Sequence, residues 1–285
     1  MCFLCDLKSP SPSASARPWQ ARRGFLLAAA AAAIVAPAAM AQVNVGKASS
    51  LRKLVPAETI EKAGAQQFVA TVNEAQQQNA LLPRDHPQSV RLRRIAQRII
   101  PHATAWNPRA KDWQWEVALI HSKQINAFCL PGGKIAFFTG ILDQLQLSDD
   151  EAAMIMGHEM AHALREHARE RLAKSTATSL GLRLGSELLG LGNIGAAAAD
   201  MGTQLLTLKF SREDESEADL VGLELAARGA YRPDASVSLW QKMAKANGSG
   251  GIAFLSTHPS GPQRIETLQA NVPKVQRLYE AASKG

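Results

Sequence analysis

Residues 151–169 read EAAMIMGHEMAHALREHAR, and the pentapeptide His158-Glu159-Met160-Ala161-His162 inside this stretch decides how the rest of the chain is interpreted. On a helix, histidines four residues apart lie on one face, so both imidazoles can reach the same metal ion. Glu159 projects to the flank of that face, where a carboxylate can take a proton from a metal-bound water. The pentapeptide therefore offers two zinc ligands and a base, although a motif with three fixed positions also arises by chance.

The neighbouring residues predict that this stretch is a buried helix. Ser148 and Glu151 fit a capping box, and the two aspartates between them complement the positive end of the helix dipole. Residues 152–164 are almost wholly apolar outside the pentapeptide. Burying two histidines and a glutamate without partners costs several kcal/mol, and a metal ion removes that cost.

The first 41 residues are typical of an export signal. Arg22-Arg23 precede an Ala-rich apolar run that ends in Ala39-Met40-Ala41, which matches the basic region, short hydrophobic region and cleavage site of a signal peptide. The run is too short to span a bilayer. The paired arginines also suit a twin-arginine signal, and the general secretory route stays open as the alternative. We expect a signal peptide over residues 1–41, a flexible linker over residues 42–55 and one domain over residues 56–285.

Cysteine usage and charge exclude several classes of function. Without the signal, Cys129 is the only cysteine, so no internal disulfide can form, and we expect its thiol in an apolar strand rather than as a nucleophile. Lys and Arg exceed Asp and Glu by 7 in the whole chain (32 against 25) and by 4 in residues 42–285 (28 against 24). No arginine-rich block carries interleaved aromatic residues, so the sequence gives no sign of nucleic-acid binding.

The hydrophobic pattern predicts an α+β fold that is mainly helical. Apolar residues recur at helical spacing after Pro56 and over residues 88–100, whereas residues 113–120 alternate as in a strand. Residues 124–139 suggest a hairpin that turns at Pro131-Gly132-Gly133, just before the H-E-x-x-H helix. The edge of this hairpin could hold an extended peptide by β-augmentation, or the hairpin could be purely structural.

Residues 180–201 are rich in Gly, Ala and Leu. Three charged residues interrupt this stretch, so its uncharged run is too short for a membrane span. We expect a loosely packed helical hairpin or lid, and contact with lipid is the alternative.

A helix predicted over residues 211–228 carries further candidate ligands. Glu215 and Asp219 lie one turn apart on the same face. Glu215 could be a third metal ligand, and Asp219 could accept the outer N–H of a zinc-bound histidine and so fix its tautomer. An acidic helix start is also a common response to the helix dipole, so the metal interpretation depends on its coincidence with H-E-x-x-H.

H-E-x-x-H followed about fifty residues later by E-x-x-x-D resembles the gluzincin family that contains HtpX, the CAAX prenyl endopeptidases and the periplasmic peptidase BepA. Residues 126–140 and 211–219, and Thr257-His258-Pro259 with Arg264-Ile265, agree with this family. A metzincin would need glycine at position 165 and histidine at position 168, where this chain has Arg165 and Ala168. His167 is out of register with that pattern, and we expect it to face solvent.

We expect the chain to depart from the family pattern in two ways, of which the first favours the soluble BepA-like branch and the second sets the chain apart from BepA-like proteins. The chain lacks the transmembrane helices of the HtpX and CAAX branches, and it also lacks tetratricopeptide repeats after a helix expected at residues 274–282. We therefore expect a zincin-like metallopeptidase domain with a small sheet or hairpin beside the active-site helix.

The resemblance implies one Zn²⁺ per chain, bound by His158, His162 and Glu215. Glu159 would be the base, and Asp219 would orient a ligand histidine. His258 and Arg264 match family positions that would stabilise the oxyanion. For His258 two alternatives remain, a fourth zinc ligand in a resting enzyme and a loop residue fixed by Pro259.

The implied function is an exported zinc endopeptidase of the periplasm that hydrolyses unfolded or misassembled envelope proteins. Contact with the membrane or with outer-membrane assembly machinery is a further expectation, and the oligomeric state is left open. The main alternative is a chaperone or binding module on a peptidase fold, with little or latent proteolytic activity. A purely structural metal is a third alternative, against which the adjacent glutamate and an open ligand position argue.

Overall fold

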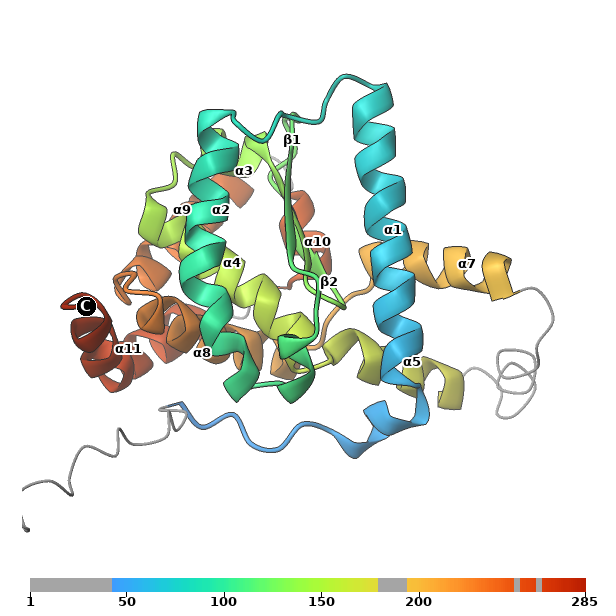
Figure 1. Cartoon of the computed structure of the whole chain (residues 1–285). Coiled ribbons are helices and arrows are strands. Elements are labelled where there is room, and N and C mark those ends of the chain that lie inside the picture. Colours follow the sequence, from blue (N-terminus) through green and yellow to red (C-terminus); the bar gives the residue numbers. More distant parts are fainter. Residues whose placement is uncertain (1–42, 179–193, 249–251, 260–262) are drawn as a thin grey trace, which may run out of the picture. The chain divides into compact units, whose positions relative to one another are not determined.

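Helices make up most of the described chain, and a three-stranded sheet stands among them (Figure 1). The computed structural model describes residues 43–178, 194–248, 252–259 and 263–285, apart from the side chains of residues 175–178 and 194–200. Residues 41–285 form one compact unit. The predicted signal over residues 1–41 lies outside the described residues. The expected α+β class, mainly helical with a small sheet, is confirmed.

The elements follow one another in a simple order. The helices are α1 (Ala57–Gln77), α2 (Pro87–Ile99), α3 (Thr139–Gln144), α4 (Asp149–Leu164), α5 (His167–Thr178), α7 (Ile194–Thr207), α8 (Arg212–Arg228), α9 (Ala235–Asn247), α10 (Ala253–Thr257) and α11 (Arg264–Ala282). The strands are β1 (Glu116–Ile120), β2 (Ala127–Leu130) and β3 (Lys134–Phe138), and short 3₁₀ turns are η1 (Ser50–Leu54), η2 (Ile100–Ala105) and η3 (Pro108–Lys111).

The sheet has the strand order β1-β3-β2, so β1 and β2 are its two edges. β2 and β3 form the predicted antiparallel hairpin, and β1 pairs with β3 in parallel. The hairpin turns at Gly132 and Gly133, whose φ angles of 87° and 79° favour glycine. Strand β2 packs against α4, so the β2 edge is next to the H-E-x-x-H helix.

Helix α4 forms the centre of the core. It contacts α8, α2, α9 and β2, and its residues 151–164 are all buried. Helix α8 crosses α4 at two glycines, where a Cβ atom on Gly157 would lie 2.6 Å from the Gly222 carbonyl oxygen. The absence of both side chains therefore lets the two helices approach closely enough for their polar side chains to meet.

The segment before α1 differs from the flexible linker predicted for residues 42–55. Val43 is buried and donates its N–H to Glu224 Oε2 at 3.1 Å, and Arg165 Nη2 donates to the Gly46 carbonyl at 3.0 Å. Arg52 pairs with Glu166 at 3.0 Å, and η1 packs against α5. These contacts fix residues 43–55 to the domain.

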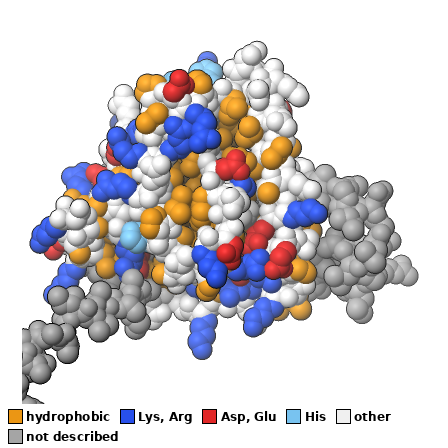
Figure 2. Space-filling view, in the orientation of Figure 1, with side chains coloured by type: hydrophobic (Ala, Val, Ile, Leu, Met, Phe, Trp, Pro, Cys, Tyr) orange, Lys and Arg blue, Asp and Glu red, His pale blue; other side chains and the backbone are white. Residues whose placement is uncertain are grey.

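Hydrophobic side chains line a hollow on the face between α1 and α2, over the edge of β1 (Figure 2). Its volume is about 410 Å³. Part of the β1 edge is covered, because Leu82 N–H donates to the Leu119 carbonyl at 2.9 Å. This hollow lies along the edge of the sheet formed by β1, whereas the polar cluster described below is next to the opposite edge, β2.

The segment predicted as a lid, residues 180–201, falls largely outside the described residues. Its last part opens α7, which packs against α1 and contacts β2 (Figure 1). Among the described residues, no helix has both the length and the apolar character needed to cross a bilayer.

Candidate metal centre

Helix α4 holds three of the predicted site residues in its buried interior. It begins with the predicted capping box, because Ser148 Oγ accepts from Glu151 N–H at 3.2 Å and Glu151 Oε2 accepts from Ser148 N–H at 2.9 Å. His158, Glu159 and His162 are only 2–3% exposed. Such burial of polar groups requires partners within the protein.

Helix α8 supplies carboxylates opposite these groups. It also begins with a capping box, in which Ser211 pairs with Asp214. Glu215 and Asp219 follow, and both are buried. Since α8 crosses α4 at Gly157 and Gly222, both carboxylates face the histidines of α4.

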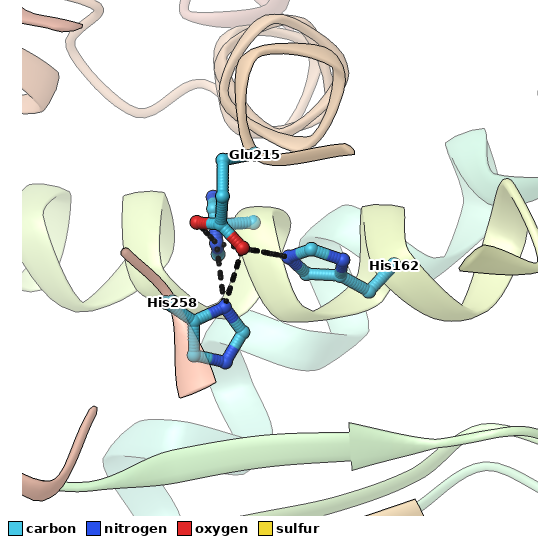
Figure 3. Close-up of side chains that lie close together, drawn as sticks. His162, Glu215 and His258 are labelled. Carbon is cyan, nitrogen blue, oxygen red and sulfur yellow. Dashed lines mark hydrogen bonds and ion pairs between the residues drawn. The ribbon is translucent and has the colours of Figure 1, made fainter. Parts of the chain in front are cut away.

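Four side chains converge on one point. Figure 3 shows His162, Glu215 and His258 directed toward one another beside α4. His158 Nε2 lies 3.1 Å from His162 Nε2 and 3.3 Å from His258 Nδ1. Glu215 Oε1 lies 3.4 Å from His162 Nε2 and 3.1 Å from His258 Nδ1, and Oε2 lies 3.5 Å from His158 Nε2.

These distances fit the ligands of a single tetrahedral metal ion. Nitrogen and oxygen ligands about 2.0–2.1 Å from zinc stand roughly 3.3–3.4 Å apart in a tetrahedron. All four ligand atoms are buried and lie within 4.8 Å of one another. Glu215 Oε2 forms no hydrogen bond within the described residues, although it lies 3.1 Å from the Arg264 guanidinium as an ion pair. A bound cation would satisfy this oxygen and the converging lone pairs together.

His258 reaches the cluster from the C-cap position of α10, directly after the helix and far from α4 and α8 in the sequence. Its ring stacks on Phe254, with centroids 4.4 Å apart and planes 17° apart. Nδ1 faces the ligand cluster, whereas Nε2 lies 3.5 Å from Glu159 Oε1. In this arrangement, His258 takes the fourth ligand position and also contacts the predicted base.

Asp219 and Arg264 lie behind His158. Asp219 Oδ1 is 3.0 Å from His158 Nδ1, the outer nitrogen, as the sequence predicted. Arg264 pairs with both oxygens of Asp219 at 2.5 and 2.7 Å and with Glu215 Oε2 at 3.1 Å. Its guanidinium also stacks 3.3 Å above the Trp240 ring. Arg264 thus pairs with the ligand Glu215 and with Asp219 behind His158, while the predicted role at the oxyanion stays a prediction.

His167 is buried, so the prediction that it faces solvent is wrong. It is 2% exposed, and its Nδ1 lies 2.9 Å from Nδ1 of His162. The prediction was based only on the register of the metzincin pattern, whereas in the structure α4 ends at Leu164 and Glu166 has a φ angle of 61°. This left-handed residue turns the chain, and His167 returns against α4. The extra histidine after H-E-x-x-H was the available signal in the sequence.

Burial and neighbouring charge alter the protonation of the cluster. Burial lowers the pKa of His158, but the hydrogen bonds and charges of Asp219 and Glu215 outweigh it and raise the pKa to about 9. Burial lowers the pKa of His162 well below its usual range. Burial also opposes ionisation of Glu215, yet its three histidine neighbours lower its pKa. One imidazolium, one neutral imidazole and one carboxylate can thus share the metal-free cluster.

Glu159 differs from Glu215, because burial raises its pKa. Its Oε1 also lacks a hydrogen bond within the described chain. A buried carboxylate of raised pKa next to a metal position is suited to take up a proton and release it.

A narrow cavity of about 40 Å³ separates the cluster from the β2 edge. Phe210 lies on one side and stacks on His162, with ring centroids 3.9 Å apart. Cys129 of β2 also lines the cavity, and burial raises the pKa of its thiol well above the usual range. Cys129 is therefore part of the wall, in line with the prediction of a core cysteine.

A family model for peptidase family M48 matches residues 86–272. The chain belongs to peptidase family M48. Mitochondrial metalloendopeptidase OMA1 of Schizosaccharomyces pombe is 36% identical to it over 205 residues, which are 71% of this chain and 58% of OMA1. Metalloprotease LoiP of Escherichia coli is 24% identical over 152 residues, or 52% of this chain and 59% of LoiP.

The beta-barrel assembly-enhancing protease of Yersinia pestis is 28% identical to this M48 chain over 179 residues, or 58% of this chain and 36% of the relative. Each of these matches spans less than two thirds of the relative. The predicted metallopeptidase family is confirmed. The predicted preference for the BepA-like branch is not, since the identity to OMA1 is higher.

Proposed function

We propose that this chain is a zinc endopeptidase that cuts unfolded or misassembled proteins of the cell envelope. The observation that carries the proposal is the convergence of His158, His162 and Glu215 beside the buried base Glu159. The M48 family and its metalloendopeptidase relatives support a metal-dependent reaction. Zinc suits the nitrogen-rich ligand set and the ligand spacing.

In the proposed reaction, each residue around the cluster has one task. Zinc, when bound, supplies Lewis-acid polarisation of the scissile carbonyl and activates a water. Glu159 takes a proton from the water as the new C–O bond forms, and delivers it to the nitrogen as the C–N bond breaks. Asp219 accepts the Nδ1 proton of His158, which leaves the Nε2 lone pair free for the metal.

We propose that the arrangement of His258 is a resting state. Its Nδ1 stands with the three ligand atoms, and its Nε2 lies next to Glu159. A substrate carbonyl and water need this position, so His258 has to move before cleavage. We propose that the displaced imidazole then stabilises the developing oxyanion.

The proposed substrate class follows from how little space a substrate has to reach the buried ligands. The ligands are buried, and the neighbouring cavity of about 40 Å³ cannot admit a folded domain. An extended segment could pair with the edge of β2 and reach Glu159 if the covering residues moved aside. The predicted export signal supports a periplasmic location, and the name of the beta-barrel assembly-enhancing protease supports contact with outer-membrane assembly machinery.

The closed site also favours a second candidate function, a binding or chaperone module with latent proteolytic activity. In that case, the domain would hold unfolded clients on the surface and seldom cut them. The buried Glu159 and the occupied fourth position are the observations that favour it.

Glu159→Gln separates the two functions. With zinc supplied, we expect the variant to keep its metal content but to lose cleavage of casein, because an amide cannot accept the proton. Glu213→Gln on exposed α8 surface is the matched control and should leave both unchanged. Undiminished cleavage by Glu159→Gln would remove the assigned base. Absence of cleavage in the wild type, with casein aggregation still suppressed, would support the chaperone module.

A further inference from the structure

The outer nitrogens of the two histidines on α4 have different partners. Nδ1 of His158 lies 3.0 Å from a carboxylate, Asp219. Nδ1 of His162 lies 2.9 Å from another imidazole nitrogen, Nδ1 of His167. A hydrogen bond between two ring nitrogens needs one protonated and one unprotonated nitrogen. In the contact between His162 and His167, therefore, only one of the two Nδ1 atoms carries a proton.

The surroundings of His167 determine which nitrogen carries the proton. Its Nε2 faces Glu217, with Oε2 at 3.5 Å, and Arg165 forms an ion pair with the other oxygen of Glu217. A carboxylate paired with an arginine offers only acceptor oxygens, so Glu217 can accept a hydrogen bond from His167 but cannot donate one. His167 Nε2 has no hydrogen bond within the described residues, and the nearest oxygen it faces is this acceptor, which favours a proton on Nε2 and a bare Nδ1.

The tautomer of His167 also determines the tautomer of the ligand His162. A bare Nδ1 on His167 accepts the Nδ1 proton of His162, and the Nε2 lone pair of His162 then points at the ligand cluster. Phe210 stacks on the His162 ring at 3.9 Å and restricts its rotation. Arg165, Glu217 and His167 thus form a relay that acts on His162 as Asp219 and Arg264 act on His158.

We propose that His167 is a positioning residue that fixes the tautomer and orientation of His162 for metal binding. The inference rests on the proposed zinc site. The imidazole of His167 lies between the Glu217 carboxylate and the His162 ring. Removal of the relay should weaken metal binding by about 10–100-fold, as is usual for groups that orient ligand histidines.

Two variants of similar size test the relay. In His167→Asn the side-chain oxygen occupies nearly the place of Nδ1 and can accept the His162 proton, whereas His167→Leu has the same shape without an acceptor. Zinc affinity is measured by competition with a chromophoric chelator, starting from metal-free protein. We expect affinity about 10–100-fold weaker for His167→Leu and within a few-fold of wild type for His167→Asn.

The outcomes separate this proposal from the proposed function. Equal loss in both variants would mean that His167 only packs, and wild-type affinity in His167→Leu would also overturn the proposal. If the wild type and Glu215→Ala both fail to bind zinc, the proposed function fails as well. Wild-type zinc binding that Glu215→Ala abolishes, with no effect of His167→Leu, overturns the relay alone.

A spectroscopic measurement covers the case in which His167→Leu does not fold. In ¹⁵N-labelled zinc-loaded wild type, the imidazole ¹H–¹⁵N correlations report which nitrogen of each ring is protonated. We expect His162 to carry its proton on Nδ1 and His167 on Nε2. Protonation of His167 on Nδ1 would overturn the proposal.

Discussion

His258 has two different contacts through its two ring nitrogens. Nδ1 lies with the metal-ligand atoms and Nε2 lies beside Glu159, so one side chain contacts both the ligand set and the base. Stacking on Phe254 holds the ring in this position. Movement of one short helix, α10, therefore changes both the ligand set and the environment of the base.

Removal of the His258 imidazole should expose the fourth ligand position. In zinc-loaded His258→Ala, we expect a small hydroxamate to bind at least about tenfold more tightly than in wild type, because it no longer competes with a ligand nitrogen. Isothermal titration calorimetry measures the affinity for the hydroxamate directly. Inhibition of cleavage is not suitable, because His258 also takes part in the proposed reaction. Weaker or unchanged hydroxamate binding would show that His258 does not block the metal.

The residues of the site were predicted unequally well. His158, His162 and Glu215 lie together as expected because helical spacing fixes which side chains share a face. The extra histidine, His167, was visible in the sequence, but helical spacing could not place its side chain, because the left-handed residue Glu166 interrupts the helix. A break of this kind changes which side chains meet, and helical spacing in the sequence does not reveal it.

At the scale of elements, the crossing of α4 and α8 sets the distance between the histidines and Glu215. A Cβ atom on Gly222 would lie 2.6 Å from the backbone nitrogen of His158, closer than any ordinary contact. The obstacle is backbone, so a larger residue has to displace a helix. The ligand spacing therefore depends on two residues that carry no side chain.

Gly222→Ala should separate the helices and weaken both the fold and the metal site. We expect a loss of about 1–3 kcal/mol in the free energy of unfolding of the metal-free protein and weaker zinc binding. Urea unfolding and chelator competition measure the two effects. Gly248→Ala is the control, because its nearest neighbour would lie at 3.5 Å and the change should cost less than about 0.5 kcal/mol. Equal stability of both variants would contradict the close crossing.

The start of α4 predicts a dependence of stability on pH. Burial opposes ionisation of Glu151, but Lys242, at 2.7 Å, and the Ser148 backbone lower its pKa below 4.5. A lowered folded-state pKa contributes stability above pH 4.5 that is lost as the pH falls through the folded-state pKa. In metal-free protein, Glu151→Gln should therefore be less stable than wild type at pH 6, and the difference should shrink below pH 4.5. Urea unfolding across this range measures it, and a constant difference would contradict the ionised cap.

The elements themselves were largely predictable, and their ends less so. The hairpin and the H-E-x-x-H helix occur where the alternation and the capping box predicted them. The final helix was predicted over residues 274–282, but α11 begins at Arg264 and contains Pro273, a residue that usually ends or kinks a helix. Tertiary packing of its buried residues Leu268 and Val275 overrides that local signal.

At the scale of the whole molecule, the ligand cluster joins three parts of the chain. α4, α8 and α10 each contribute, and the ligands span residues 158–258. An ion held between them binds the folded chain much better than the unfolded one, so its binding free energy adds to stability. Metal binding at this site therefore stabilises the fold of the whole domain.

Metal removal should lower the melting temperature. At zinc concentrations about 100 times Kd, binding adds about 2.7 kcal/mol, and a domain of this size shifts by about 2–4 °C per kcal/mol, so we expect a fall of about 5–11 °C in EDTA. Differential scanning calorimetry with zinc and with EDTA measures it. Glu215→Ala should show little difference between the two conditions. The same EDTA shift in that variant would place the stabilising ion elsewhere.

The reactivity of Cys129 can report how often the cavity beside the ligand cluster opens. Its thiol is buried in β2 next to Glu159 and Phe210, and its raised pKa leaves little reactive thiolate. In a Cys2→Ser, Cys5→Ser background, alkylation can proceed only as often as the cavity becomes accessible, so the labelling rate divided by that of a free thiol gives the open fraction. A rate equal to that of global unfolding would mean that peptide entry requires a partner that forces the cleft apart. A much faster rate would mean that the protease samples its receptive form spontaneously, without any trigger.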